Sequence, residues 1–357
     1  MKDLLIKLIS REIRELDGYP VESPACPIRL DANENPFTMP PFLHEKFLAV
    51  LSQVSLNRYP EPGSPSLLAR FAEAYGVGRG MLMAGNGSDE LIQILCTATA
   101  GARVLVPVPT FAMYRISAIN NGHKVIEAPL NDDFDLDLPG MLKLVKKYLP
   151  ALIFLSYPNN PTGNCFSRDK IEILIQQSPG LVVVDEAYGN FSNQSFIPLL
   201  KNYENLVILK TLSKIGLAAL RIGFLIGRSP LVHELNKVRL PYNLNALSQA
   251  AAGFYLDHET IFLDQAAELV KSRDKLFHAL LQIEGIRPYR SEANFIFFSC
   301  LFDTDKVYNA LRDQGILVKN FKNASGVKNC MRVTVGKAEE NAAFLETLQR
   351  IIAKLGE

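Results

Sequence analysis

A lysine, a carboxylate and an amide each follow a separate apolar run in this chain. Lys214 comes after NLVILKT (205–211), Asp185 ends the run LVVVD, and Asn160 follows ALIFLSYP (151–158). An amine can hold an aldehyde as a Schiff base, and a carboxylate can keep a pyridine nitrogen protonated. These are the groups needed to hold pyridoxal phosphate, so the sequence points to an enzyme of amino-acid chemistry.

Each of these residues also has a simpler interpretation. Asp185 leaves a buried run, where its ionised form is costly without a cation such as a pyridinium, but it can equally cap the next helix. Tyr188 shares a face with Asp185 if a turn begins there, and its hydroxyl then reaches the cofactor; otherwise it packs in the core. Asn160 lies in Asn-Asn-Pro-Thr-Gly, which is also typical of a plain turn.

A glycine-containing loop before a helix is a candidate phosphate site. Gly87, Ser88 and Asp89 open a predicted helix, where backbone N–H groups and the helix dipole favour an anion. Ser88 and Asp89 can alternatively be helix caps. Ser213 and Arg221 are candidate donors to the same phosphate, although Arg221 can also be an exposed residue at a strand start.

The elements that must position these residues alternate between strand and helix. Apolar runs with β-branched residues predict strands at 103–109, 151–158, 181–187, 205–211 and 224–227, with helices at 88–99 and 168–178 between them. This alternation predicts an α/β fold whose large domain has a mixed, mostly parallel sheet flanked by helices. Because ligands bind outside the carboxyl ends of such strands, Asn160, Asp185 and Lys214 should meet at one edge of the sheet.

The length and the change of pattern after residue 262 predict a second domain. At 357 residues the chain is longer than one core usually supports. A long amphipathic helix (263–285) is followed by fewer strands, in which polar and apolar residues alternate, and by a closing helix. We expect an N-terminal arm (1–40) that packs on the small domain and the site entrance, a large cofactor-binding domain (41–261) and a small α+β domain (262–357). The first twenty residues predict one amphipathic helix.

Composition excludes several classes of protein. The net charge of +1 gives no overall field that would attract nucleic acid or an acidic membrane, although it leaves room for a local basic patch. Five scattered cysteines without a Cys-x-x-Cys pair argue against a disulfide framework and a structural metal site, and so for reduced thiols. The charged N-terminus is unlike a signal peptide, and no apolar run approaches the roughly 18 residues of a membrane span. We expect a cytoplasmic protein with no metal, nucleic-acid or membrane partner.

In their order along the chain, these segments resemble the histidinol-phosphate aminotransferase family of fold-type I pyridoxal-phosphate enzymes. NPTG, DEAY and Ser-Lys are shared by many aminotransferases, whereas NENP, PYN with LSQ, and RVTVG before an acidic helix start are more specific to this family. The similarity runs from about residue 16 to the C-terminus. The matching segments include LDANENPF (30–37), RYPEPGS (58–64), GNGSDELI (85–92), SYPNNPTGN (156–164), VVVDEAY (182–188), TLSK (211–214), PYNLNALSQAA (241–251) and MRVTVGKAEEN (331–341).

The resemblance implies a role for each candidate residue. Lys214 would bind the cofactor covalently and move the substrate Cα proton, with Asp185 on the pyridinium and Tyr188 and Asn160 on the phenolic oxygen. Tyr114 would stack on or flank the ring. The phosphate would be held by Gly87, Ser88, Asp89, Ser213 and Arg221. Tyr59 would be donated by the second subunit of a homodimer, and the residues near the substrate would be Tyr19, Asn35, Lys319 and Arg332.

Two departures from the family pattern bear on these roles. Six residues separate Lys214 from Arg221 where the family usually has seven, and Ala219 replaces the usual glycine. Arg221 is therefore expected to reach the phosphate from a shifted backbone. Lys319 stands where many members have arginine, which keeps the positive charge but loses the bidentate fork.

The implied reaction is reversible transfer of an amino group between histidinol phosphate and 2-oxoglutarate, in histidine synthesis. An aromatic amino-acid aminotransferase and a lyase similar to threonine-phosphate decarboxylase remain as alternatives. A non-catalytic pyridoxal-phosphate sensor is a third, but such proteins usually carry a DNA-binding domain, and no basic helix-turn-helix pattern precedes residue 30.

Overall fold

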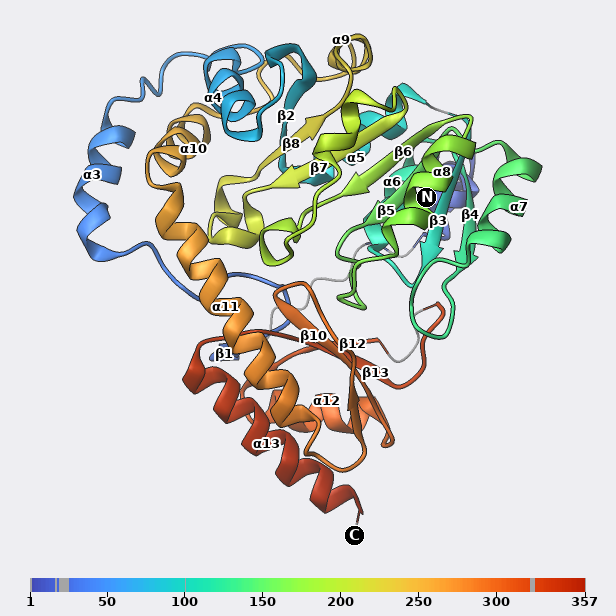
Figure 1. The fold of residues 1–357 in the computed structure, drawn as a ribbon, viewed down its shortest axis with the longest axis vertical. Coiled ribbons are helices and arrows are strands. Elements are labelled where there is room, and N and C mark those ends of the chain that lie inside the picture. Colours follow the sequence, from blue (N-terminus) through green and yellow to red (C-terminus); the bar gives the residue numbers. More distant parts are fainter. Residues whose placement is uncertain (1, 17, 19–25, 100, 322–324, 357) are drawn as a thin grey trace.

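The computed structural model describes residues 2–16, 18, 26–99, 101–321 and 325–356. Its largest element is a seven-stranded sheet in the order β2-β8-β7-β6-β5-β3-β4 (Figure 1). The strands are β2 (Leu82–Asn86), β3 (Arg103–Val108), β4 (Lys124–Pro129), β5 (Leu152–Ser156), β6 (Leu181–Asp185), β7 (Leu206–Thr211) and β8 (Ile222–Ile226). All neighbours pair in parallel except β8, which runs antiparallel to both β7 and β2. The expected mixed, mostly parallel sheet is confirmed.

Helices cover both faces of this sheet because its central strands are apolar on both sides. Val182 and Val184 of β6 point into one core, while Val183 between them points into the other. The helices of the first face are α4 (Pro65–Tyr75), α7 (Leu138–Tyr148), α8 (Arg168–Gln177) and α10 (Ala246–Asp257). Those of the second face are α5 (Gly87–Ala98), α6 (Ala112–Asn120) and α9 (Ser229–Asn236). α3 (Pro41–Ser52) lies outside the first group, against α10.

A smaller unit follows and has its own core. Its antiparallel sheet has the order β12-β13-β10-β9, and long helices cover one face of it (Figure 1). The elements are α11 (Glu259–Leu280), β9 (Ile286–Pro288), β10 (Phe295–Cys300), α12 (Thr304–Asp313), β11 (Ile316–Leu317), β12 (Lys319–Asn320), β13 (Cys330–Thr334) and α13 (Ala338–Gly356). The residue range expected for the small domain starts inside α11, whose Phe262 packs in the large core and whose Ala266 packs in the small core.

Three details of the strands differ from the expectations. β4 was missed because its residues are mostly half-buried or exposed, so it lacks an apolar run. β8 is antiparallel because only two short 3-10 turns, η4 (Ser213–Ile215) and η5 (Ala218–Leu220), separate it from β7, too few residues for a crossover helix. β10 and β13 are buried on both sides rather than alternating, and Phe297 of β10 packs against Phe134 of the large unit.

The N-terminal segment is divided between the two units. Instead of one helix it forms α1 (Lys2–Leu8) and α2 (Arg11–Arg14), because the Ser10 hydroxyl caps the second helix by accepting from the Ile13 N–H at 3.3 Å. α2 lies against α6 of the large unit rather than on the small one. Further along, β1 (Ile28–Arg29) pairs in parallel with β11 of the small unit, and Leu30 joins the small core.

Candidate active site

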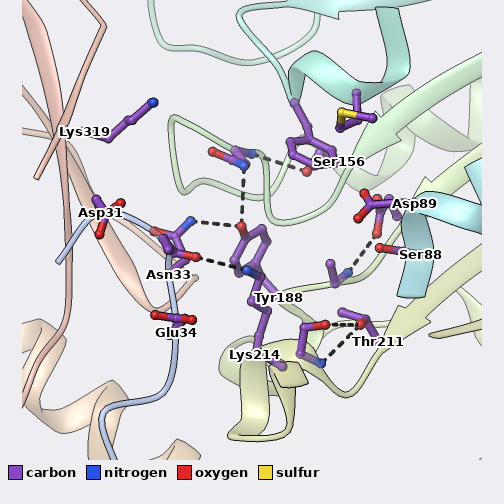
Figure 2. Close-up of a pocket in the computed structure, with 18 of the residues that line it drawn as sticks. Asp31, Asn33, Glu34, Ser88, Asp89, Ser156, Tyr188, Thr211, Lys214 and Lys319 are labelled. Atoms are coloured by element: carbon purple, nitrogen blue, oxygen red, sulfur yellow. Dashed lines mark hydrogen bonds between the residues drawn. The ribbon is translucent and has the colours of Figure 1, made fainter. Parts of the chain in front are cut away.

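A pocket of about 380 Å³ lies where the carboxyl edge of the large sheet meets the small unit and residues 29–34. β5, β6 and β7 end at this edge, and the register places Ser156 beside Asp185. The loops and turns that follow these strands carry Asn160, Tyr188 and Lys214 into the pocket. Figure 2 shows Tyr188 and Lys214 there. Asn160, Asp185 and Lys214, expected from their strand-end positions to meet at one edge of the sheet, all line this pocket.

Lys214 lies on the short turn η4, directly after β7. Its Nζ donates a hydrogen bond to the Ala32 carbonyl at 3.2 Å and lies 5.7 Å from the centre of the Tyr188 ring. Burial and, to a smaller extent, the positive charge of Arg332 lower the pKa of Lys214 to about 8. A substantial fraction of this amine is therefore neutral, and hence nucleophilic, at mildly basic pH.

Asp185 is buried at the end of β6 and is 2% exposed. Its Oδ2 accepts from the Tyr114 hydroxyl at 2.8 Å, and its Oδ1 accepts from the Ala187 N–H at 3.1 Å. Both donors are neutral, so burial raises the pKa of Asp185 to about 6. A cationic group bound in the pocket beside this carboxylate would favour its ionised form. That requirement agrees with a pyridinium nitrogen, and the next helical turn, η2 (Gly189–Phe191), has Tyr188 rather than Asp185 at its N-cap position.

A hydrogen-bond network joins the two units across the pocket. Asn160 contacts the Tyr188 hydroxyl through Nδ2 at 3.4 Å, and its Oδ1 accepts from Arg332 of β13. Asn33 donates to the same Tyr188 hydroxyl at 2.9 Å (Figure 2). Arg332 also donates to the Asp31 carbonyl, so one guanidinium links the large unit to the N-terminal segment.

The phosphate candidates meet at the N-terminus of α5. A Cβ added to Gly87 would lie 2.6 Å from Arg221 Nη2, which shows how close the guanidinium comes to this loop. Arg221 donates to the Ser213 hydroxyl at 3.4 Å and pairs with Asp89 at 3.0 Å. It reaches this position from a left-handed backbone with φ of 52°. With six residues between Lys214 and Arg221, the arginine lines the pocket.

Two cations stand opposite each other on the small sheet. Lys319 of β12 pairs in register with Arg332 of β13, and both line the pocket. Like charges at directly opposed positions destabilise a sheet, so an anion between them would be stabilising. Arg29 of β1 lines the same pocket. This wall of the pocket is suited to a phosphate or carboxylate.

Comparison with known proteins agrees with this geometry. The model of the family "Aminotransferase class I and II" matches residues 26–348. Histidinol-phosphate aminotransferase 2 of Nitrosococcus oceani is 45% identical over 353 residues, covering 98% of each chain. The chain belongs to the class I and II aminotransferases.

Solved structures of aminotransferases and related enzymes share the fold. Histidinol-phosphate aminotransferase from Sinorhizobium meliloti, in complex with pyridoxal-5'-phosphate, superposes with a TM-score of 0.86 at 22% identity, over 98% of this chain and 99% of that one. L-threonine-O-3-phosphate decarboxylase from Porphyromonas gingivalis gives 0.78 at 22% identity, over 91% and 99%. The fold alone therefore does not separate transferase from lyase.

Most of the candidate residues of this aminotransferase come together, and among the described ones Asn35 and Tyr59 do not line the pocket. Eleven line the pocket: Ser88, Asp89, Tyr114, Asn160, Asp185, Tyr188, Ser213, Lys214, Arg221, Lys319 and Arg332. Gly87 lies directly beside Arg221. The side chain of Asn35 has other partners. Its amide nitrogen donates to Gln265 of α11 at 3.3 Å, and its amide oxygen accepts from the Phe37 N–H at 2.8 Å. Tyr59 is 80% exposed and stacks on Tyr242, while Tyr19 lies outside the described residues.

Two aromatic residues near the start of α6, Phe111 and Tyr114, line the pocket. Tyr114 is fully buried, with its ring stacked on Phe154 at 4.9 Å, and its hydroxyl donates to Asp185. Phe111 is half-buried, lines the pocket and lies edge-on to Tyr114. Both aromatics lie in the sequence PTFAMY, three residues apart. How each of them is placed relative to the pocket depends on where α6 starts, which the sequence alone does not fix. Asn33, the first residue of the NENP motif (33–36), and Arg29, four residues before it, also line the pocket and were not selected from the sequence.

The described residues contain neither a membrane-spanning helix nor a cluster of metal-binding side chains. Within the described part of the chain, no helix combines the length and apolar character that crossing a bilayer requires. Nor do the described residues bring three His, Cys, Asp or Glu side chains into a group suited to a metal ion. All five cysteines are free thiols.

Proposed function

We propose that this aminotransferase moves an amino group reversibly between histidinol phosphate and 2-oxoglutarate in histidine biosynthesis, giving imidazole acetol phosphate and glutamate. The observation that carries the proposal is the pocket itself, where Lys214 and Asp185 face a wall formed by Lys319 and Arg332. The 45% identity to a histidinol-phosphate aminotransferase supports the choice of substrate.

The cofactor we propose is pyridoxal 5'-phosphate, and the donor set fits it. Asp185, buried without a cationic donor, suits the pyridinium, while the α5 N-terminus with Ser213 and Arg221 suits the phosphate. When bound, the cofactor supplies an electron sink for the negative charge that develops at the substrate Cα. Gly87, Ser88 and Asp89 would add backbone donors, and the Asp89 carboxylate would stay paired with Arg221.

The remaining side chains would orient the reacting groups. Lys214 would attach the cofactor and carry the proton to and from Cα, which its lowered pKa favours. Tyr188 and Asn160 would contact the phenolic oxygen. Phe111 would flank the ring, and Tyr114 would support Asp185 from behind.

Both substrates are anionic, so the pocket must accept a phosphate and a carboxylate in turn. Arg332, 5% exposed and fixed by Asn160, would hold an anion close to the reacting carbon. Lys319 and Arg29 would extend the positive surface for the donor's phosphate. A lysine has one charge on a flexible side chain, whereas an arginine has a rigid fork of donors. The flexible charge of Lys319 would suit anions bound at several positions.

We further propose a homodimer in which Tyr59 completes the partner's site. Tyr59 and Tyr242 form an exposed stack with ring centres 4.5 Å apart, and exposed apolar side chains lie nearby in sequence. These are Phe42, Leu48, Leu56, Leu240 and Leu247. Residues 1–40, 41–261 and 262–357 would act as arm, cofactor-binding domain and small domain of a cytoplasmic enzyme.

The test is an amino-donor screen with 2-oxoglutarate as acceptor. We expect glutamate from histidinol phosphate, at a higher kcat/KM than from phenylalanine, and no CO₂ from threonine phosphate. The Lys319→Gln variant should raise the KM for histidinol phosphate by about tenfold while changing that for phenylalanine less. CO₂ release without glutamate would establish the lyase instead, and preference for phenylalanine would establish an aromatic aminotransferase.

A further inference from the structure

Asn33 is held rigidly between the two units of the molecule. It is 1% exposed and has a left-handed backbone with φ of 55°, a conformation that asparagine tolerates. Its N–H donates to the Thr334 hydroxyl at 3.0 Å, and its carbonyl accepts from Asn294 at 3.0 Å. The backbone on both sides of this side chain is therefore fixed.

The hydrogen bonds around Asn33 determine which way its amide faces. The Thr334 hydroxyl accepts from the Asn33 N–H, so its own proton is free to be donated to Asn33 Oδ1, 3.1 Å away. With Oδ1 used in this way, Nδ2 faces the Tyr188 hydroxyl at 2.9 Å. An amide nitrogen only donates, so Tyr188 is the acceptor.

A second donor acts on the same hydroxyl. The Arg332 guanidinium cannot accept a hydrogen bond, so it fixes Oδ1 of Asn160 toward itself and leaves Nδ2 facing Tyr188 at 3.4 Å. A phenolic oxygen with donors on two sides keeps its single proton for a third direction. Because Tyr188 lines the pocket, that direction is toward a bound ligand.

We propose that Asn33 is a positioning residue that makes Tyr188 a hydrogen-bond donor to the ligand in the pocket. The proposal rests on the proposed cofactor, whose phenolic oxygen is the acceptor. Asn33 acts only through Tyr188, and its contribution is to prevent the hydroxyl from turning its proton toward the N-terminal segment.

Asn33→Asp tests this directly, since the new carboxylate can accept from Thr334 and Tyr188 but cannot donate. A hydrogen bond donated to the cofactor's phenolic oxygen stabilises its anionic form, so losing it raises the pH at which the visible chromophore loses its proton. We expect Asn33→Asp to raise the midpoint of the absorbance titration of the cofactor-loaded protein by about one unit, the effect of one lost hydrogen bond to a charged oxygen.

The Tyr188→Phe background is the matched control for the added charge. There, Asn33→Asp should shift the midpoint by much less than in the Tyr188 protein, because only the electrostatic effect remains. Equal shifts in the two backgrounds would overturn the role of Asn33. If Tyr188→Phe alone left the midpoint unchanged, Tyr188 would not contact the cofactor, and the assignment of Tyr188 in the proposed function would fail as well.

Asn33→Gly keeps the test available if the buried carboxylate prevents folding. Glycine accepts the positive φ and neither donates nor accepts through a side chain. We expect a shift in the same direction but smaller than with Asn33→Asp, because no acceptor then captures the Tyr188 proton. An unchanged midpoint in Asn33→Gly, together with a folded protein by circular dichroism, would contradict the proposal.

Discussion

At the scale of single residues, the pocket adjusts acid–base properties mainly by burial. Burial lowers the pKa of Lys214 and raises that of Asp185, moving both toward the physiological range. These shifts belong to the free protein, and a bound cofactor would replace them with direct interactions. These two pKa shifts are therefore expected to affect the binding of the cofactor to the free protein most directly.

The rate at which Lys214 attaches the cofactor should depend on pH. Because the neutral amine is the nucleophile and its pKa is lowered to about 8, the rate should rise about tenfold per pH unit below pH 8 and level off above it. Stopped-flow absorbance after mixing apoprotein with pyridoxal phosphate, at several pH values, measures this. Levelling off only near pH 10 would mean that Lys214 has the pKa of an ordinary exposed lysine.

Tyr114→Phe should reduce turnover while preserving packing. Its hydroxyl lowers the pKa of Asp185, so removing it weakens that carboxylate as a partner for a pyridinium. We expect kcat to fall about tenfold and the free energy of unfolding to fall by about 1–2 kcal/mol.

Tyr157→Phe is the matched control for this variant. Tyr157 is equally buried, but its hydroxyl donates to Gln194 instead of a residue of the pocket. It should cost similar stability in chemical denaturation and leave kcat unchanged. Equal losses of kcat in both variants would mean that Tyr114 acts through general packing only.

At the scale of elements, the site depends on how β2 and β8 meet. β8 is antiparallel to both neighbours, so β2 runs in the same direction as β7 and its end reaches the same edge of the sheet. The start of β8 reaches that edge too. Arg221 and the N-terminus of α5 are thereby brought together although they are far apart in sequence.

Gly223→Ala should disrupt this meeting point. A Cβ at Gly223 would lie 2.6 Å from the Ser88 N and 2.7 Å from the Gly87 C, both backbone atoms that must shift. We expect the dissociation constant for pyridoxal phosphate to rise at least about tenfold and stability to fall by about 1–3 kcal/mol. Gly227→Ala, just after the same strand with its nearest contact at 3.6 Å, should change cofactor affinity little in fluorescence titrations.

Much of the large sheet and the central residues of the site could be predicted from the sequence, because both depend on local sequence patterns. Val182–Val184 predict a doubly covered strand, and Asp185 follows directly, so the position of its carboxylate needs only the strand end. Asn33 could not be chosen over Asn35 because their difference lies in contacts with Tyr188 and Thr334, far along the chain. β4 was not predicted because it is an edge strand, and an edge strand does not need the apolar run by which the other strands were recognised.

At the scale of the whole molecule, two subunits should be needed for each complete site. The exposed Tyr59 and the pocket-lining Lys214 of one chain would then serve different sites. This arrangement can be tested by mixing variants that damage one residue each.

Tyr59→Ala and Lys214→Ala proteins should complement each other. After subunit exchange at equal concentrations, half of the dimers would be hybrids with one intact site in two, so about one quarter of full activity should return. Each variant alone should have low activity in the aminotransferase assay. No gain on mixing, with hybrid dimers detected by native mass spectrometry, would show that Tyr59 serves its own chain or none.

The network through Asn160, Arg332 and Asp31 ties the two halves of the chain together at the pocket that we propose binds the cofactor and substrate. A molecule bound there contacts both halves. Its binding therefore stabilises the contact between the two halves rather than either half alone. In differential scanning calorimetry, the ligand-free protein should melt in two overlapping steps, the smaller half first. With cofactor and substrate analogue bound, the two steps should merge into a single sharper peak at higher temperature.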